Sequence, residues 1–493
     1  MDIPLPLEAV DRIEILPGSG SSAHGADAFG GTVNIVSRKP KETFISVRVG
    51  GGSFGTASGA LATGGSINNM GQIFAIEGGK SDGFMPDRDS KSYAISSRSY
   101  LDSIIGSTGL ILGLTKKDFG AFDFYTPGLG YASREWTRAY FSGLTHVINA
   151  DRTVITISGS FHRHDDRFQL DQDNPLIPIR QHQTRIWSGS AQASVRPEDW
   201  LDITIGAESA QDSIESTSLG NHLRHRFGIF GESSIEIYKG LNILSGLRHD
   251  TTGDNRSWSP SGGASWWFTG SSRLRIHAAK SFRIPSFTEL YYLDKKKTNT
   301  GNSGLKPEEA LSYEAGIDWI PSADSSFSFT AFDREQEGTI DWVGPTRKGP
   351  WRAVNSDSMR FYGTEALAKA RLASIDTFLG LNQTWSRYSS DDYSKYALIY
   401  PDRTWKAGLN TILLLETSLS LVFQHRKQHG GGETVLLDCR ISRQFHGITA
   451  YIEGSNILDR RYEEPVGISQ PGIWLGGGIS YSWSAHNSTP ANP

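Results

Sequence analysis

The sequence lacks several features that would place it in a common protein class. It contains a single cysteine, Cys439, so neither a disulfide within the chain nor a cysteine-rich metal site is possible. Its 49 lysines and arginines nearly balance its 53 aspartates and glutamates, whereas a nucleic-acid-binding chain would carry a basic surplus. We therefore expect no disulfide framework and no nucleic-acid partner.

Long apolar runs are also missing. No stretch reaches 18 uninterrupted apolar residues, which is the length that a membrane-spanning helix requires. The most apolar segment, LNTILLLETSLSLVF (residues 409–423), is interrupted by polar residues and is predicted to form two strands and a turn. The opening MDIPLPLEAV has neither the basic nor the apolar region of a signal peptide.

What the sequence does contain, after Pro40, is alternation with a period of two residues. In SSFSFTAFDR, for example, Phe327 and Phe329 alternate with serine and threonine. Similar runs of about ten residues recur along the chain, separated by segments rich in Gly, Asp, Asn, Pro and Ser. This alternation predicts half-buried β-strands.

Short links between these runs alternate with long ones. SINNMGQ (66–72) and PSADSS (321–326) are short, whereas DRFQLDQDNPLIPIRQHQTR (166–185) is long. Short turns at one end and long loops at the other are typical of a transmembrane β-barrel with one lipid-facing and one lumen-facing side to each strand. At roughly 20 residues per strand and loop, the chain provides about 22 strands. The alternative is a soluble all-β protein such as a propeller, but no repeat of about 40–50 residues recurs.

The segment VDRIEILPGSGSSAHGADAFGGTVNIVSRKP (10–40) resembles the end of the plug domain of TonB-dependent outer-membrane receptors. The plug motif is carried by Arg12, Glu14, Gly18, Gly25, Gly30, Gly31 and Asn34. The segment departs from the family pattern at Pro17 and His24. Two consecutive glycines allow a close approach of neighbouring backbone, which agrees with this resemblance.

Further motifs follow in the family's order and extend the resemblance over nearly all of residues 3–483. They are GLRHD (246–250), KSFRIPSFTELYY (280–292), NSGLKPEEALSYEAGIDW (302–319) and the final IEGSNILDRRYEEPVGISQPGIWLGGGISYSW (452–483). Two segments, KDFGAFDFYTPG (117–128) and FHRHDDRFQLDQDNP (161–175), resemble cobalamin-receptor-like members.

The resemblance implies an all-β fold: a large transmembrane antiparallel β-barrel of about 22 strands with a remnant of an N-terminal plug domain. Residues 1–40 would be the C-terminal part of the plug, 41–484 the barrel and 485–493 a polar tail. The implied function is TonB-energised uptake of a scarce ligand of cobalamin or ferric-siderophore type, with no enzymatic reaction and no cofactor.

The resemblance also implies partners and a location. The expected partners are outer-membrane lipid, a small-molecule metal chelate and, in the full-length form, TonB. We expect a monomer in the cell outer membrane of Gram-negative type. Because the signal peptide, the TonB box and most of the family's plug are not found in the sequence, we expect an N-terminally truncated chain: a fragment, a split or decayed gene, or a real short form. The alternative function is then a passive porin-like channel or a non-functional fragment.

Charged residues of the plug and barrel motifs suggest how the plug is held. Arg12 and Glu14 alternate with apolar residues of the plug segment. The candidate barrel partners, in family-like positions, are Arg283, Glu289, Glu308 and Glu314. We hypothesise that plug and barrel charges pair inside the lumen, where loss of one partner of a buried pair costs about 3–5 kcal/mol. The simpler interpretation is separate, solvated charges on a wet wall.

A second candidate is a dense group of imidazoles and carboxylates. It comprises His164, Asp165, Asp166, Asp171 and Asp173. Aspartate oxygens suit Ca²⁺, so a cation or ligand site is one interpretation. No EF-hand spacing is present, and a charged extracellular loop is the interpretation that the sequence favours.

Overall fold

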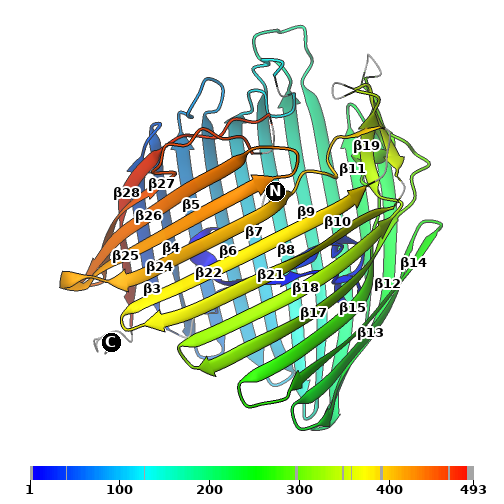
Figure 1. Cartoon of the computed structure of the whole chain (residues 1–493), viewed down its shortest axis with the longest axis vertical. Coiled ribbons are helices and arrows are strands. Elements are labelled where there is room, and N and C mark those ends of the chain that lie inside the picture. Colours follow the sequence, from blue (N-terminus) through cyan, green and yellow to red (C-terminus); the bar gives the residue numbers. More distant parts are fainter. Residues whose placement is uncertain are drawn as a thin grey trace.

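The computed structural model describes residues 4–39, 42–126, 128–294, 298–346, 349–356, 358–388, 392–464 and 467–485. Within them, 22 antiparallel strands close into one barrel, in which the last strand, β28, pairs with the first, β3 (Figure 1). The all-β prediction and the expected number of strands are confirmed. Of the predicted polar tail, residues 485–493, all but residue 485 lie outside the described residues.

The barrel strands differ in length, from 8 residues in β27 to 19 in β10 and β12. In chain order they are β3 (Phe44–Gly52), β4 (Thr56–Ile67), β5 (Met70–Ser81), β6 (Ser90–Ser103), β7 (Gly106–Gly120), β8 (Arg134–Ala150), β9 (Thr153–Gln169), β10 (Arg180–Glu198), β11 (Leu201–Ser216), β12 (Gly220–Tyr238), β13 (Leu241–Thr252), β14 (Asn255–Trp267), β15 (Ser272–Arg283), β17 (Glu308–Ser322), β18 (Ser325–Glu337), β21 (Met359–Leu372), β22 (Ile375–Tyr388), β24 (Pro401–Ile412), β25 (Thr417–Gln428), β26 (Glu433–Phe445), β27 (Ile448–Ser455) and β28 (Trp474–Ser484). A strand of about 9–11 residues crosses a bilayer, so the longest strands continue beyond the membrane.

The predicted division into short and long connections is confirmed. At the end of the barrel where β3 begins, the turns are as short as residues 68–69 between β4 and β5. The segment 409–423 forms β24, the 3-10 turn η3 (Leu414–Glu416) and β25, as expected. The long link at 166–185 was predicted too long, because β9 runs to Gln169 and β10 begins at Arg180. None of the helices in the described residues has the length and apolar character needed to cross a bilayer.

A small sheet lies at the long-loop end of the barrel. Its strands are β16 (Asn299–Thr300), β20 (Trp351–Asn355), β19 (Ile340–Gly344) and β23 (Tyr393–Ser394), in that spatial order. Its core joins Leu305, Ile340 and Trp342. Helix α2 (Phe287–Tyr291) precedes it and begins with a capping box between Ser286 and Glu289.

Residues 4–39, which the resemblance assigns to the plug and which we call the plug hairpin, lie within the barrel (Figure 1, dark blue). Its elements are η1 (Leu7–Ala9), β1 (Val10–Pro17), α1 (Ser21–His24), η2 (Gly25–Asp27) and β2 (Gly31–Ser37). β1 and β2 pair antiparallel, with Glu14 opposite Asn34 and Pro17 opposite Gly31. The hairpin thus consists of two short strands around a turn of small residues.

Candidate functional site: the plug seat and the barrel mouth

Short hydroxyl side chains make much of the contact between the plug hairpin and the barrel wall. Ser19 Oγ lies 3.1 Å from Ser281 Oγ and 2.9 Å from Ser312 Oγ. On the neighbouring turn, Ser261 Oγ donates to Ser22 Oγ at 3.0 Å. These contacts place the turn around α1 against β14, β15 and β17.

Arg334, on β18, binds the same serine pair from the side. Its Nη1 donates to Ser19 Oγ at 3.0 Å and to Ser312 Oγ at 3.1 Å. Its guanidinium lies 4.2 Å from the ring centre of Phe29, within the range of a cation–π contact. Arg334 therefore touches the plug through both a hydrogen bond and an aromatic ring.

Arg248, on β13, is the most deeply buried charge at the plug seat, with 1% of its surface exposed. Its guanidinium bonds to Asp250 at 2.8 Å and to Glu208 at 2.5 Å. Nη1 lies 3.4 Å from the carbonyl oxygen of Ala23 in the plug. The backbone of Gly25 (φ +73°) approaches this guanidinium so closely that a Cβ there would lie 2.8 Å from Nη2. A side chain at this position would thus displace either the plug or Arg248.

Among the described residues, three ion pairs join the plug to the barrel: Glu8–Arg48, Asp27–Arg226 and the exposed pair Lys39–Asp102, with 3.4 Å between Nζ and Oδ1. Glu8 Oε1 lies 2.7 Å from Arg48 Nε, and this carboxylate is 9% exposed. Asp27 Oδ2 lies 3.1 Å from Arg226 Nη1, but the aspartate is 72% exposed. The first pair is shielded from water and the second is open to it, so the first contributes more to seating.

Arg12 and Glu14, which the sequence suggests as plug charges that pair with the barrel, form their ion pairs within the plug hairpin. Arg12 Nε lies 2.7 Å from Glu14 Oε1, and Nη1 lies 2.9 Å from Asp11 Oδ2. Asn34 Nδ2 donates to the other Glu14 oxygen at 2.9 Å; this bond and Arg12 hold the pKa of the Glu14 carboxyl below its usual range. Within the described residues these ion pairs stay inside the hairpin, and it is Glu8 and Asp27 that reach barrel arginines.

Three of the four candidate barrel partners pair with one another. Arg283 binds Glu289 at 3.0 Å and Glu308 at 2.7 Å. Glu308 Oε2 also accepts a hydrogen bond of 2.5 Å from the backbone N–H of Ile340. This group thereby ties α2 and the small sheet to the wall, at the mouth of the barrel.

The fourth, Glu314, packs against Gly18 of the plug. Gly18 has φ +85°, and a Cβ there would overlap the Glu314 carboxylate. The remaining plug-motif glycines, Gly30 and Gly31, precede and begin β2. Sequence spacing places all of these residues at the plug, but it does not identify their partners.

The mouth of the barrel carries a group of aromatic and cationic side chains. The His222 ring stacks on Tyr291 with centres 3.5 Å apart and planes 5° apart. Arg224 lies 4.8 Å from the ring centre of Phe287, and Arg180 Nη1 donates to the hydroxyl of Tyr292 at 2.5 Å. These contacts bring β10 and β12 together with the segment of α2, which is distant in sequence.

The imidazole and carboxylate group divides between a strand and a loop. His164, Asp165 and Asp166 lie within β9, not in a loop, because β9 continues beyond the membrane. Asp165 pairs with Arg163 at 2.8 Å, and Asp171 Oδ1 accepts from the backbone of Asp173 at 3.1 Å. Among the described residues no three His, Cys, Asp or Glu side chains are arranged to hold a metal ion, so the geometry does not support a cation site here.

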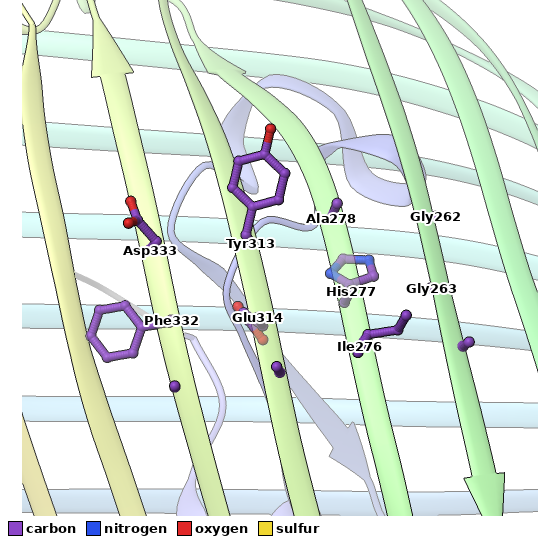
Figure 2. Close-up of a pocket in the computed structure, with 12 residues that line it drawn as sticks. Gly262, Gly263, Ile276, His277, Ala278, Tyr313, Glu314, Phe332 and Asp333 are labelled. Atoms are coloured by element: carbon purple, nitrogen blue, oxygen red, sulfur yellow. The ribbon is translucent and has the colours of Figure 1, made fainter.

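A depression of about 580 Å³ lies over β14, β15, β17 and β18 (Figure 2). Tyr313 stands in front of the strands, whereas His277 and Glu314 lie behind them, toward the plug hairpin (Figure 2). Tyr313 and Glu314 are adjacent in a strand and therefore face opposite sides. The depression is thus formed at least partly on the outer wall, where Ala278 and Ala315 leave room.

Comparisons with known proteins agree with this architecture. A family model described as "TonB dependent receptor-like, beta-barrel" matches residues 48–422. The vitamin B12 transporter BtuB of Photobacterium profundum is 24% identical over 391 residues, covering 74% of this chain and 61% of that protein. BtuB of Vibrio vulnificus strain YJ016 is 23% identical over 422 residues, covering 79% and 64%. The chain thus spans about three fifths of the length of these relatives.

Solved structures share the fold. The siderophore receptor PirA from Pseudomonas aeruginosa superimposes with a TM-score of 0.79 at 18% identity, covering 98% of this chain and 88% of that one. The matched family model extends over most of the barrel that the structure closes. The chain therefore belongs to the TonB-dependent receptor family and is an outer-membrane β-barrel protein.

Proposed function

We propose that the protein is an outer-membrane receptor that binds a scarce metal chelate, of cobalamin or ferric-siderophore type, at the mouth of the barrel. TonB would then energise displacement of the plug, so that the ligand passes through the lumen. The work is binding and transport, without making or breaking covalent bonds. The relatives are named as vitamin B12 transporters and the similar structures as siderophore receptors, which supports both ligand classes.

The observation that carries this proposal is that three of the barrel arginines touching the plug have carboxylate partners within the barrel as well. Arg48 lies 3.7 Å from Glu77, Arg226 lies 3.0 Å from Asp212, and Arg248 binds Asp250 and Glu208. A buried charge that loses its partner costs about 3–5 kcal/mol. Because these arginines keep a partner when the plug leaves, displacement avoids most of that cost.

The mouth supports the binding step. The His222–Tyr291 stack offers flat aromatic surface, and Arg224 and Arg180 add positive charge beside it. Large chelates with aromatic or anionic groups are recognised by this combination of rings and guanidinium groups. These side chains lie above the plug hairpin, on the long-loop side, where an incoming ligand would arrive.

Binding is tested with the full chain, purified in detergent and titrated with cyanocobalamin and, separately, with a ferric catecholate siderophore. We expect one of the two to bind, and the double variant His222→Ala/Tyr291→Ala to weaken that binding at least tenfold. Trp258→Ala, at an exposed aromatic of β14, is the matched control and should bind like wild type. Absence of binding by both ligands would reject the proposal.

Transport is tested apart from binding, by ligand uptake into a receptor-deficient host with and without a functional TonB. Uptake that requires TonB supports the proposal. Steady ion conductance in a planar bilayer, together with uptake that is indifferent to TonB, would instead support the passive channel.

A further inference from the structure

The hydrogen-bonded ladder between β14 and β15 ends below the mouth-side ends of the two strands. Its last pair is Ser261 with Ala279, although β14 continues from there to Asn255 and β15 to Arg283. Over these unpaired stretches, which lie wholly within the described residues, each strand stays paired with its other neighbour, β13 or β17. Pro260, next to the last pair, has no N–H to donate to a ladder.

We call residues 257–260 of β14 and 280–283 of β15 the upper seam. Figure 2 shows the two strands diverging above Ala278, with the plug hairpin behind them. The turn of the plug hairpin supplies a hydrogen-bond partner at the seam, because the backbone N–H of Phe282 donates to Ser21 Oγ at 3.4 Å. The plug turn thus takes the place that a β14 carbonyl group has in the ladder below.

The burial of Phe282 shows how far the plug turn reaches into the upper seam. Ser281 faces the lumen, where its Oγ donates to the carbonyl oxygen of Phe29 at 3.3 Å, so the next residue, Phe282, lies on the other face of the strand. A side chain on the lipid-facing side of a barrel has little protein to cover it. Phe282 is nevertheless 2% exposed and forms a buried cluster with Ala26 of the plug and Ile284. The plug turn therefore fills the space between the two strands.

Ser259 is left without a partner in this arrangement. It is completely buried, and its Oγ has no hydrogen-bond partner among the described residues. A buried hydroxyl group without a partner is unfavourable. If the ladder continued in register, Ser259 would lie opposite Ser281, where two hydroxyl side chains can bond to each other. With the plug seated, Ser281 instead contacts Ser19 and the carbonyl oxygen of Phe29.

The other pairs of a continued ladder also match in polarity. The same register sets Trp258 opposite Phe282 on the lipid-facing side and Ser257 opposite Arg283 on the lumen side. Aromatic pairs directly opposite each other stabilise a sheet, and Trp258 is 54% exposed while the seam is open. Only Pro260 lacks a donor for the ladder. The two strands are thus complementary along the whole upper seam, although they are not paired there.

The upper seam lies at the outer edge of the hydrocarbon layer. Phe282 is ten residues beyond Ser272, where β15 begins, and about 9–11 residues of a tilted strand span the layer. Backbone groups without partners are strongly unfavourable in lipid. If the plug left and the seam stayed open, groups such as the N–H of Phe282 would be without a partner at this depth.

We propose that the upper seam has two arrangements: it is open around the turn of the seated plug, and it closes by four further pairs of β14 with β15 when the plug leaves. In the closed arrangement Ser259 pairs with Ser281, and Phe282 moves to the lipid-facing side beside Trp258. The wall then remains continuous while the plug is away, and a returning plug must reopen the seam. The inference rests on the plug displacement of the proposed function, but its test requires neither ligand nor TonB, so failure of ligand binding or uptake leaves the test unaffected.

The test measures how fast a disulfide forms across the upper seam in the full chain. Ser259→Cys and Ser281→Cys are introduced together with Cys439→Ser, which removes the only other thiol. A disulfide requires Cα atoms about 4.4–6.8 Å apart, a distance that directly opposed residues of a ladder provide. Gly25→Leu displaces the plug turn, because a Cβ there would lie 2.8 Å from Nη2 of Arg248. We expect this substitution to accelerate the seam disulfide at least about tenfold.

Two further cysteine pairs serve as controls. Ser261→Cys/Ala279→Cys joins the last pair of the ladder and should oxidise equally fast with the plug seated or displaced. Ser22→Cys/Ser261→Cys reports the seated plug, since the two hydroxyl oxygens are 3.0 Å apart, and should oxidise more slowly once the plug is displaced. If this second pair shows that the plug has not moved, Gly18→Leu is added, because a side chain there overlaps the Glu314 carboxylate.

A seam disulfide that forms equally fast with the plug seated and displaced, or in neither case, would overturn the proposal. The converse experiment keeps the native Gly25 and so does not depend on the folding of a plug variant. Once the seam disulfide has formed in that chain, the plug has lost its seat. Trypsin should then cleave the plug hairpin at Arg12, in β1, at least about tenfold faster than in the reduced protein. Equal cleavage of the oxidised and reduced proteins would likewise refute the closed arrangement.

Discussion

Replacing Arg248 by methionine tests how the plug seat is stabilised. Arg248 is 1% exposed and binds two carboxylates, Asp250 and Glu208, of which Asp250 is itself buried. With arginine present, one positive charge faces two negative ones. With methionine, the two carboxylates face each other in the lumen without their cation.

We expect the Arg248→Met substitution to lower the free energy of unfolding by about 3–5 kcal/mol, because it strands buried charge. The loss of the contact with the carbonyl oxygen of Ala23 adds little, since that bond is 3.4 Å long. Urea unfolding in detergent, followed by tryptophan fluorescence and by the gel mobility of the folded barrel, measures the change.

If stranded charge is the cause, removing one carboxylate must restore stability. The double variant Arg248→Met/Asp250→Asn should therefore recover part of the loss. Arg256→Met, at an exposed position of β14, is the control and should change stability by less than about 0.5 kcal/mol. A cost of under about 1 kcal/mol for Arg248→Met, or a double variant no more stable than the single one, would refute the reasoning.

Three further predictions concern the plug and the small sheet. Glu8→Gln should cost about 1–3 kcal/mol in urea unfolding because the carboxylate is buried against Arg48, whereas Asp27→Asn, at an exposed pair, should cost under about 1 kcal/mol. Gly18→Ala should cost at least about 2 kcal/mol, because φ is +85° and the new methyl group meets Glu314; adding Glu314→Ala should relieve the overlap but not the backbone strain. Burial raises the pKa of Asp341; hydrogen bonds from Ser394 and from backbone N–H groups lower it, but burial has the larger effect. The small sheet should therefore be most stable below the ordinary pKa of 3.8 and lose stability as the pH rises through the raised value. Hydrogen exchange of β19, corrected for its intrinsic pH dependence, should show this loss, and Asp341→Asn should abolish it.

The barrel was predictable from sequence because lipid imposes a simple constraint. Each outward position within the bilayer must be apolar, so alternation marks strands such as β18, in which Phe327 and Phe329 face outward. That constraint ends where the strand leaves the membrane. In β9 the pairing continues through His164 and Asp166, whose polar character resembles that of a loop. The ends of the strands were therefore misplaced while the strands themselves were found.

The candidate site was less predictable, because its contacts join residues hundreds of positions apart. Ser19 meets Ser281 and Ser312, and no local spacing of serines indicates such a partner. Arg12 and Glu14 stand out in the sequence because they interrupt an apolar run, yet they pair with each other. The strands β16 and β23 have two residues each, too few to show any period.

The contacts at the plug seat differ in what they become when the plug leaves. When the plug leaves, each serine hydroxyl replaces its hydrogen bond to another serine by a hydrogen bond to water, which changes the free energy little. The arginines Arg48, Arg226 and Arg248 retain carboxylates of the wall.

Arg334 is different: its Nη2 is buried without a hydrogen-bond partner among the described residues while the plug is seated. An unsatisfied buried donor costs about 1–3 kcal/mol, and water would satisfy it once the lumen opens. The unsatisfied Nη2 of Arg334 therefore opposes seating, whereas the contacts of the same guanidinium with Ser19 and Phe29, the Glu8 pair and the close packing at Gly25 favour it. A balance of this kind leaves the plug in place by a modest margin, which suits a plug that must be displaced and then return.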